Sequence, residues 1–178
     1  MAFKIAKRIW FLIGLTCSAS AYVLDFYDIS ASSATPDIMD VYFKQVRISR
    51  GIYGFSGFME VKQEFDTDVT KYKLDVFYSS NGLSYSLTPF RISPTPVTSV
   101  MNKEYLIYLK DMFDKCCTNA FPYPFFSPMT IRNMTCENCQ FASNNFPTVL
   151  RVGFYKAVVS IYDKPNVTII ATGQIELS

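Results

Sequence analysis

Apolar and polar residues alternate with a period of two along several segments of the chain, a pattern typical of β-strands with one buried face. The segments are 45–48, 53–65, 71–78, 83–88 and 166–177. In an antiparallel sheet, such strands turn their apolar side chains toward a core and their polar ones toward solvent. The alternation therefore predicts a mainly β fold, either an antiparallel β-sandwich or an open β-cup.

Two further features refine this prediction. The dipeptide Asn81-Gly82 lies between two alternating segments and predicts a two-residue type I′ hairpin turn, because both residue types tolerate a positive φ. Residues 148–162 are apolar on both faces. A strand of that kind is expected in the centre of a sheet or beneath a helix, with a covering layer on each side.

One helix is predicted around residues 98–115, where the apolar spacing changes from two to steps of three and four. Its apolar stripe consists of Met101, Tyr105, Leu109, Met112 and Cys116. Ser99 and Asn102 are the candidate N-cap residues. The sequence contains no repeat and no linker composition, so residues 22–178 are expected to form a single domain.

Residues 1–21 have the composition of a signal peptide, with basic residues followed by the apolar run Ile9–Leu15 and the small residues Ala19-Ser20-Ala21. We expect cleavage after Ala21 and a secreted, extracellular protein. An uncleaved membrane anchor is the alternative, but the apolar run is shorter than the ~20 residues that span a bilayer.

The charge balance argues against nucleic acid as a partner. The formal net charge is +2, and the leader carries three basic residues and no acid, which leaves the remainder near −1. No basic patch is left to attract a phosphate backbone. Beyond the leader, the sequence has no second apolar run long enough to span a membrane.

Four cysteines follow the leader: Cys116, Cys117, Cys136 and Cys139. In an oxidising compartment they imply two disulfides. A bond between the neighbours Cys116 and Cys117 is disfavoured as strained, and the two remaining pairings stay open, because both join the 116–117 corner to the 136–139 corner. A zinc site is disfavoured, since adjacent cysteines lack the spacing of a zinc knuckle and the chain has no histidine. No metal and no cofactor is therefore expected.

The segment between the cysteine pairs is unusual because it combines prolines with four large aromatic side chains. These are Phe121, Tyr123, Phe125 and Phe126. The prolines keep the segment out of a helix or a sheet interior. The aromatic side chains then form a lid or entrance over the core, a satellite core or a protein interface. The lid or entrance is the favoured interpretation, and it makes these four residues the candidate ligand-binding residues.

Two sequons for N-linked glycosylation occur, Asn133-Met-Thr135 and Asn166-Val-Thr168. Asn166 falls on the polar side of an alternating segment, and Asn133 is expected in the loop. Both positions are predicted to be accessible. Glycosylation at either asparagine agrees with passage through the secretory pathway.

The chain contains no histidine. This excludes the Ser-His-Asp and Cys-His arrangements and removes the commonest acid/base group. The cysteines are expected in disulfides, so a thiol nucleophile is not available. Glu60 and Glu64 fit a solvated strand face, and Asp66 and Asp68 fit a turn. We therefore expect a protein that is not an enzyme.

The leader, the paired strands, the late helix, the Cys-rich loop and the segment "FPTVLRVGFYKAVVSIYDKPNVTIIATGQIEL" together resemble the insect CheB/CheA-type chemosensory proteins. These are similar to the ganglioside-activator branch of the ML lipid-recognition superfamily. The residues that carry the resemblance are Cys136, Cys139, Phe146, Pro147, Gly153, Phe154, Tyr155 and Lys156. The chain has fewer cysteines than the activator proteins, so their disulfide pairing does not transfer.

The resemblance implies a lipid-recognition β-cup with a role in gustatory perception of hydrophobic pheromones during courtship. The expected function is an extracellular binding protein for a lipid or cuticular-hydrocarbon pheromone. Its expected partners are that hydrophobic ligand and a sensory receptor or channel. The alternative is a secreted β-sandwich module that docks on a membrane receptor without a small-molecule ligand.

Overall fold

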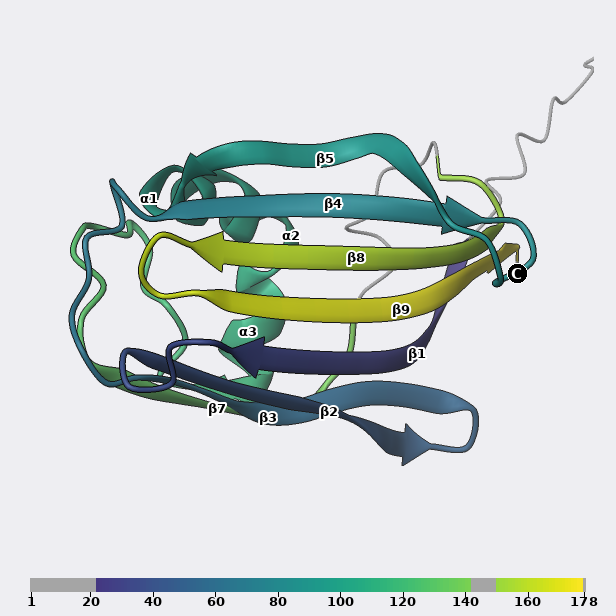
Figure 1. The fold of residues 1–178 in the computed structure, drawn as a ribbon. Coiled ribbons are helices and arrows are strands. Elements are labelled where there is room, and N and C mark those ends of the chain that lie inside the picture. The colour runs from purple at the N-terminus through teal and green to yellow at the C-terminus, as the bar shows by residue number, and fades with distance from the viewer. Residues whose placement is uncertain (1–21, 142–149, 178) are drawn as a thin grey trace, which may run out of the picture.

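The computed structural model describes residues 22–141 and 150–177, which form two antiparallel sheets and one helical segment (Figure 1). The strands are β1 (Tyr22–Ser33), β2 (Met39–Ser49), β3 (Ile52–Val61), β4 (Lys71–Ser79), β5 (Ser86–Pro96), β6 (Cys117–Thr118), β7 (Arg132–Cys139), β8 (Gly153–Tyr162) and β9 (Val167–Leu177). The predicted signal peptide 1–21 lies outside the described residues, as do Phe146 and Pro147, two positions of the family resemblance.

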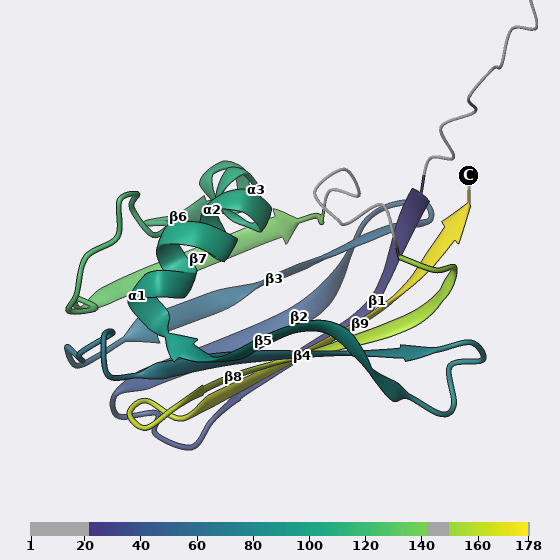
Figure 2. The same ribbon diagram turned by 90° about the horizontal axis from the view of Figure 1, so that it is seen from above.

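The five-stranded sheet has the order β1-β9-β8-β4-β5, and the four-stranded sheet has the order β2-β3-β7-β6. The edge strands β1 and β2 run beside each other and close one side of the fold. On the other side, the helical segment leaves edge strand β5 and ends at edge strand β6, so it connects the two far edges (Figure 2). The sheets stay open and do not form a barrel, which confirms the predicted mainly β architecture.

The helical segment comprises α1 (Val97–Val100), a π-helical turn η1 (Met101–Tyr105), α2 (Leu106–Tyr108) and α3 (Lys110–Cys116). The predicted helix is therefore confirmed, although it breaks at Leu109, where φ is −123°. The predicted stripe faces the core, with Tyr105 and Met112 buried. The cap prediction is wrong: the segment begins after Pro96 without a side-chain cap, and Asn102 lies inside it with a different role.

The hairpin predicted at Asn81-Gly82 exists, but its turn is not type I′. Strands β4 and β5 pair up to Tyr78 and Ser86, and a longer loop connects them. Gly82 has a φ of +76°, whereas Asn81 does not adopt a positive φ. Instead, the Asn81 side-chain oxygen accepts a hydrogen bond from the Leu83 N–H at 2.9 Å. The asparagine therefore organises the loop through its side chain, as in an Asx turn.

Three strands depart from the predicted pattern. Residues 22–33 and 132–139 were not predicted to be strands, and the latter lies within the segment expected to be a loop. Strand β5 contains Pro89, Pro94 and Pro96. It can do so because it is the edge of its sheet, where a missing backbone N–H costs no ladder hydrogen bond.

The buried core lies between β1, the four-stranded sheet, the helical segment and the 119–131 loop, and it includes Val167 at the start of β9. Phe55 of β3 is 2% exposed and contacts a group of aromatic rings. Its neighbours are Phe26, Phe43, Phe113 and Phe141, with ring centroids 5.3–6.4 Å from its own. We call the four-stranded sheet, the helical segment and this loop the packed half of the molecule.

Strand β8 occupies the centre of its sheet, as its apolar sequence predicts. The expectation that a layer covers each of its faces is wrong. All side chains from Phe154 to Tyr162 are only partly buried, including those that point toward the opposite sheet. The accessible inner face of this central strand is the centre of the candidate site.

Candidate functional site

The candidate site is the inner face of the five-stranded sheet around the middle of β4, β8 and β9. Two rows of aligned side chains cross these strands there. They are Leu74–Val159–Ile169 and Val76–Ala157–Ala171. All six side chains are aliphatic and partly exposed. We call these two rows the open inner face.

This face is the one that points toward the opposite sheet. Two members of the face, Ile169 and Ala171, pack with part of their surface against the buried core, as does Ile161, which lies on the same side of β8. The other face of the same strands is polar in part: Lys73 and Asp75 form an ion pair, and the Lys156 ammonium lies over the Phe77 ring. In a sandwich whose layers pack directly together, aliphatic side chains at the centre of an inner face would be almost fully buried. Here the two layers do not close on each other completely.

The helical segment contributes three partly buried apolar side chains that pack against the core, Met101, Leu109 and Phe113. Tyr72, two residues before Leu74 on β4, lies near Glu104 of the π-helical turn. Burial raises the pKa of the Tyr72 hydroxyl, and the Glu104 carboxylate raises it further. The Tyr72 phenol therefore keeps its proton to a higher pH than a free tyrosine does.

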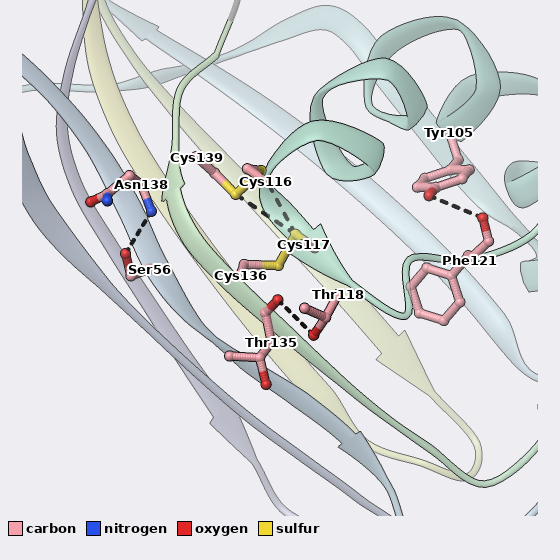
Figure 3. Close-up of a disulfide and its surroundings, with 10 residues drawn as sticks. All are labelled: Ser56, Tyr105, Cys116, Cys117, Thr118, Phe121, Thr135, Cys136, Asn138 and Cys139. Carbon is pink, nitrogen blue, oxygen red and sulfur yellow. Dashed lines mark hydrogen bonds between the residues drawn. A yellow bond between two sulfur atoms is a disulfide. The ribbon is translucent and has the colours of Figure 1, made fainter.

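Two disulfides fasten the end of the helical segment to strand β7. Cys116 bonds to Cys139 and Cys117 bonds to Cys136, which settles the pairing that the sequence left open (Figure 3). Cys117 and Cys136 are also direct partners in the β6–β7 ladder. The Cys117 and Cys139 sulfurs lie 3.7 Å apart, so the two bridges form one compact cluster. Sulfurs in disulfides are not the thiolates that a metal ion binds.

The four aromatic residues of the loop point in alternate directions. Phe121 and Phe125 are 5% and 4% exposed and belong to the core, with their ring centroids 6.3 Å apart. Tyr123 and Phe126 are 50% and 73% exposed. The structure thus groups Phe121 with Phe125 beneath the loop and leaves the other two on its outer side. A ligand-binding role for the four remains a prediction.

Asn102 holds this loop against the helical segment. Its side-chain amide donates to the Phe125 carbonyl oxygen at 2.8 Å and accepts from the Phe125 N–H at 2.9 Å. The same amide nitrogen also donates to the Thr98 carbonyl oxygen at 3.1 Å. Nothing in the sequence distinguishes Asn102 from a cap residue, because its partner is 23 positions away.

Arg132 is a second residue that the sequence did not single out. Its guanidinium carbon lies 5.2 Å from the centre of the Phe121 ring, and its Nε and Nη1 atoms are buried without a hydrogen-bond partner. The neighbouring Tyr105 hydroxyl donates to the Phe121 carbonyl oxygen at 3.4 Å. Burial and the nearby Asp114 carboxylate raise the pKa of Tyr105 to about 12. The Arg132 guanidinium acts in the opposite direction and lowers this pKa.

The two sequon asparagines are both exposed. Asn133 lies in strand β7 and not in a loop, so its predicted location is wrong while its accessibility agrees with the prediction. Asn166 immediately precedes β9, where its carbonyl oxygen accepts from the Ala34 N–H. Glycosylation at either position remains a prediction.

Comparison with known proteins adds no relative: no family model matches the chain, and no curated protein matches it. Within residues 22–141 and 150–177, every helix is too short or too polar to cross a membrane.

Proposed function

We propose that the protein is an extracellular carrier or presenter of a hydrophobic small molecule. The observation that supports this most directly is the open inner face. Six aliphatic side chains lie at the centre of a sheet and on its core-facing side, yet all stay partly exposed. An apolar ligand would remove this surface from water and gain roughly 25 cal/mol per Å² of apolar area buried.

The surroundings of this face suit a binding site that is formed before the ligand arrives. The two disulfides and the Asn102 hydrogen bonds hold the helical segment and its loop opposite the five-stranded sheet. A wall that is already ordered loses less conformational entropy when a ligand binds. Apolar lining with few polar groups is typical of sites for small hydrophobic ligands.

The biological role in this proposal rests on the resemblance to the chemosensory family. On that basis the ligand is a lipid or a cuticular-hydrocarbon pheromone, and the protein acts in gustatory perception of that pheromone. A sensory receptor or channel would then receive the loaded carrier. Secretion follows from the predicted leader, and two disulfides are typical of an oxidising compartment.

A pair of substitutions on neighbouring positions of β8 tests the proposal. Val159 lies on the open inner face, whereas Val158 points to the other side of the same strand, and both are partly buried. Val159→Phe fills space on the inner face. We expect it to weaken binding of the fluorescent probe N-phenyl-1-naphthylamine at least ~10-fold, which corresponds to about 1.4 kcal/mol. Val158→Phe should leave the affinity unchanged.

Displacement experiments complete this test. Long-chain hydrocarbons or fatty acids should displace the probe from the unsubstituted protein, and native mass spectrometry of gently purified protein should detect bound lipid. If Val159→Phe and Val158→Phe bind the probe with equal affinity, at unchanged thermal stability, the inner face is not the binding site.

A docking module without a small-molecule ligand is the second candidate, and the outer side of the loop favours it. Tyr123, Phe126 and Ile131 are 50%, 73% and 65% exposed and lie within one short segment. Exposed apolar clusters of this kind often mark protein interfaces. Phe126→Ser combined with Tyr123→Ser should abolish receptor binding and spare probe binding if docking is the function. The carrier function predicts that Val159→Phe has the larger effect on the response of the receptor-bearing cell.

A further inference from the structure

A shallow groove of about 430 Å³ lies on the outer face of the four-stranded sheet, away from the open inner face. Tyr42 and Phe58 line it with their rings, whose centroids are 6.0 Å apart. Thr135 and Glu137 contribute an exposed hydroxyl and an exposed carboxylate. The groove thus combines an aromatic floor with polar groups at its margin.

Asn133, the asparagine of the first sequon, is itself part of this groove. The strand register explains the juxtaposition. Tyr42 pairs with Phe58 across β2 and β3, and Phe58 pairs with Thr135 across β3 and β7. Asn133 precedes Thr135 by two positions on the same face, so it is the diagonal neighbour of Phe58. Diagonal neighbours in a sheet lie roughly 7–8 Å apart, within reach of long side chains.

We propose that this groove is the seat of the innermost sugar of an N-linked glycan on Asn133. One face of an N-acetylglucosamine ring presents C–H groups and carries little polarity. An aromatic π-face is negative and attracts such C–H groups, as it attracts other positively polarised edges. The sugar hydroxyls and acetamide on the other sides of the ring can hydrogen-bond to Thr135 and Glu137.

The groove is suited to an attached sugar more than to a free one. It is open and shallow, so a free saccharide would lose much translational freedom for a small contact area. A glycan linked to Asn133 is already held at the groove, and its effective concentration there is high. The attachment also explains why the exposed ring of Tyr42 and the partly buried ring of Phe58 lie on an outer sheet face, since the glycan would cover them.

The inference rests on the proposed secretion, because the sugar is added only in the secretory pathway. Its test uses the full chain secreted from a eukaryotic cell, with glycans trimmed to single N-acetylglucosamine residues by an endoglycosidase. Mass spectrometry should find Asn133 occupied. The trimmed protein should melt about 2–4 °C higher than Asn133→Gln, a shift typical of one good contact in a chain of this size.

Substitution of the aromatic floor distinguishes packing from mere attachment. In a Tyr42→Ser, Phe58→Ser background, the sugar on Asn133 should no longer raise the melting temperature. Asn166→Gln is the matched control, because Asn166 lies outside the groove, and its sugar should change the melting temperature by less than about 1 °C. In the unsubstituted protein, proton NMR should show cross-relaxation between the sugar and the Phe58 ring.

Two results would overturn the inference. One is secreted protein in which Asn133 carries no glycan. The other is a stabilisation that persists unchanged in the Tyr42→Ser, Phe58→Ser background together with absent sugar–Phe58 cross-relaxation. Both are distinguishable from failure of the carrier function, because neither depends on ligand binding at the inner face.

Discussion

The packed half and the open inner face are built from similar residues but are buried to very different degrees. In the packed half, Val61 and Met134 are 1% and 0% exposed, and rings from several elements surround Phe55. On the open inner face, Val159 and Leu74 occupy the middle of a five-stranded sheet and remain partly exposed. Apolar composition therefore does not decide which part of this molecule is core. The presence of a layer opposite each face decides it, and the uncovered face is the one available to a ligand.

Removal of both disulfides should have the largest effect and should act on the packed half. Replacing Cys116, Cys117, Cys136 and Cys139 together by Ala removes the Cys116–Cys139 bridge and the Cys117–Cys136 bridge nested within it. We expect the free energy of unfolding to fall by about 3 kcal/mol, because the loop between the two cysteine pairs is no longer closed in the unfolded chain. Urea unfolding measures the loss. Hydrogen exchange should show faster opening in β7 and α3 than in β4, β8 and β9, and an equal loss in both sheets would contradict the division into two regions.

A matched pair of valines tests the same division directly. Val61→Ala removes two methyl groups from a buried site and should cost about 2 kcal/mol of unfolding free energy, from lost transfer energy and the resulting cavity. Val159→Ala removes the same groups from a partly exposed site and should cost less than about 1 kcal/mol. Equal losses in chemical denaturation would mean that the inner face is covered in solution.

Loss of the Asn102 hydrogen bonds that hold the aromatic loop should have the next largest effect on the free energy of unfolding. Asn102→Ala removes both hydrogen bonds to the Phe125 backbone and leaves a partly buried N–H and carbonyl without their partner. The expected cost is about 1–2 kcal/mol of unfolding free energy. Gln63→Ala is the control, since it removes one exposed hydrogen bond to the Asp37 carbonyl and should cost less than about 0.5 kcal/mol. Limited proteolysis within the loop should accelerate only in Asn102→Ala.

The effect that is smallest at neutral pH concerns the buried phenol of Tyr105. Its pKa is about 12 in the folded chain and 10.0 when unperturbed. The unfolded state therefore loses this proton first as pH rises, so the folded state should lose stability between pH 10 and 12 and keep the full contribution below pH 10. Comparison of urea unfolding for Tyr105→Phe and the unsubstituted protein over this range measures the difference. A pH dependence that is identical in both would show that Tyr105 ionises equally in the two states.

The sequence predicts the parts of this fold whose pattern is local. Alternation with a period of two identifies most of β3, β4 and β9 and only a short part of β2, residues 45–48, because each of these strands has one polar and one apolar face. The stripe through Tyr105 and Met112 identifies the helical segment for the same reason, at a different period. Strand β7 was missed because its buried Met134, Cys136 and Cys139 follow a segment dominated by prolines and aromatic residues.

The aromatic loop, from which the sequence drew its candidate ligand-binding residues, is predictable only in part, and the open inner face was not singled out at all. The four loop aromatics stand out in the sequence, but their composition does not reveal that Phe121 and Phe125 turn inward while Tyr123 and Phe126 turn outward. The choice depends on Asn102, whose hydrogen bonds to Phe125 span 23 positions. Long-range contacts of this kind leave no periodic signal.

The amino-acid sequence by itself determines that this chain forms antiparallel strands with one helix, and that four cysteines join two corners of the fold. Only the tertiary structure decides which cysteines pair, which apolar faces are covered and where Asn133 lies relative to Tyr42 and Phe58. The physical reason is that side-chain periodicity is a property of neighbours along the chain. Coverage, pairing and juxtaposition depend on how distant strands are brought together.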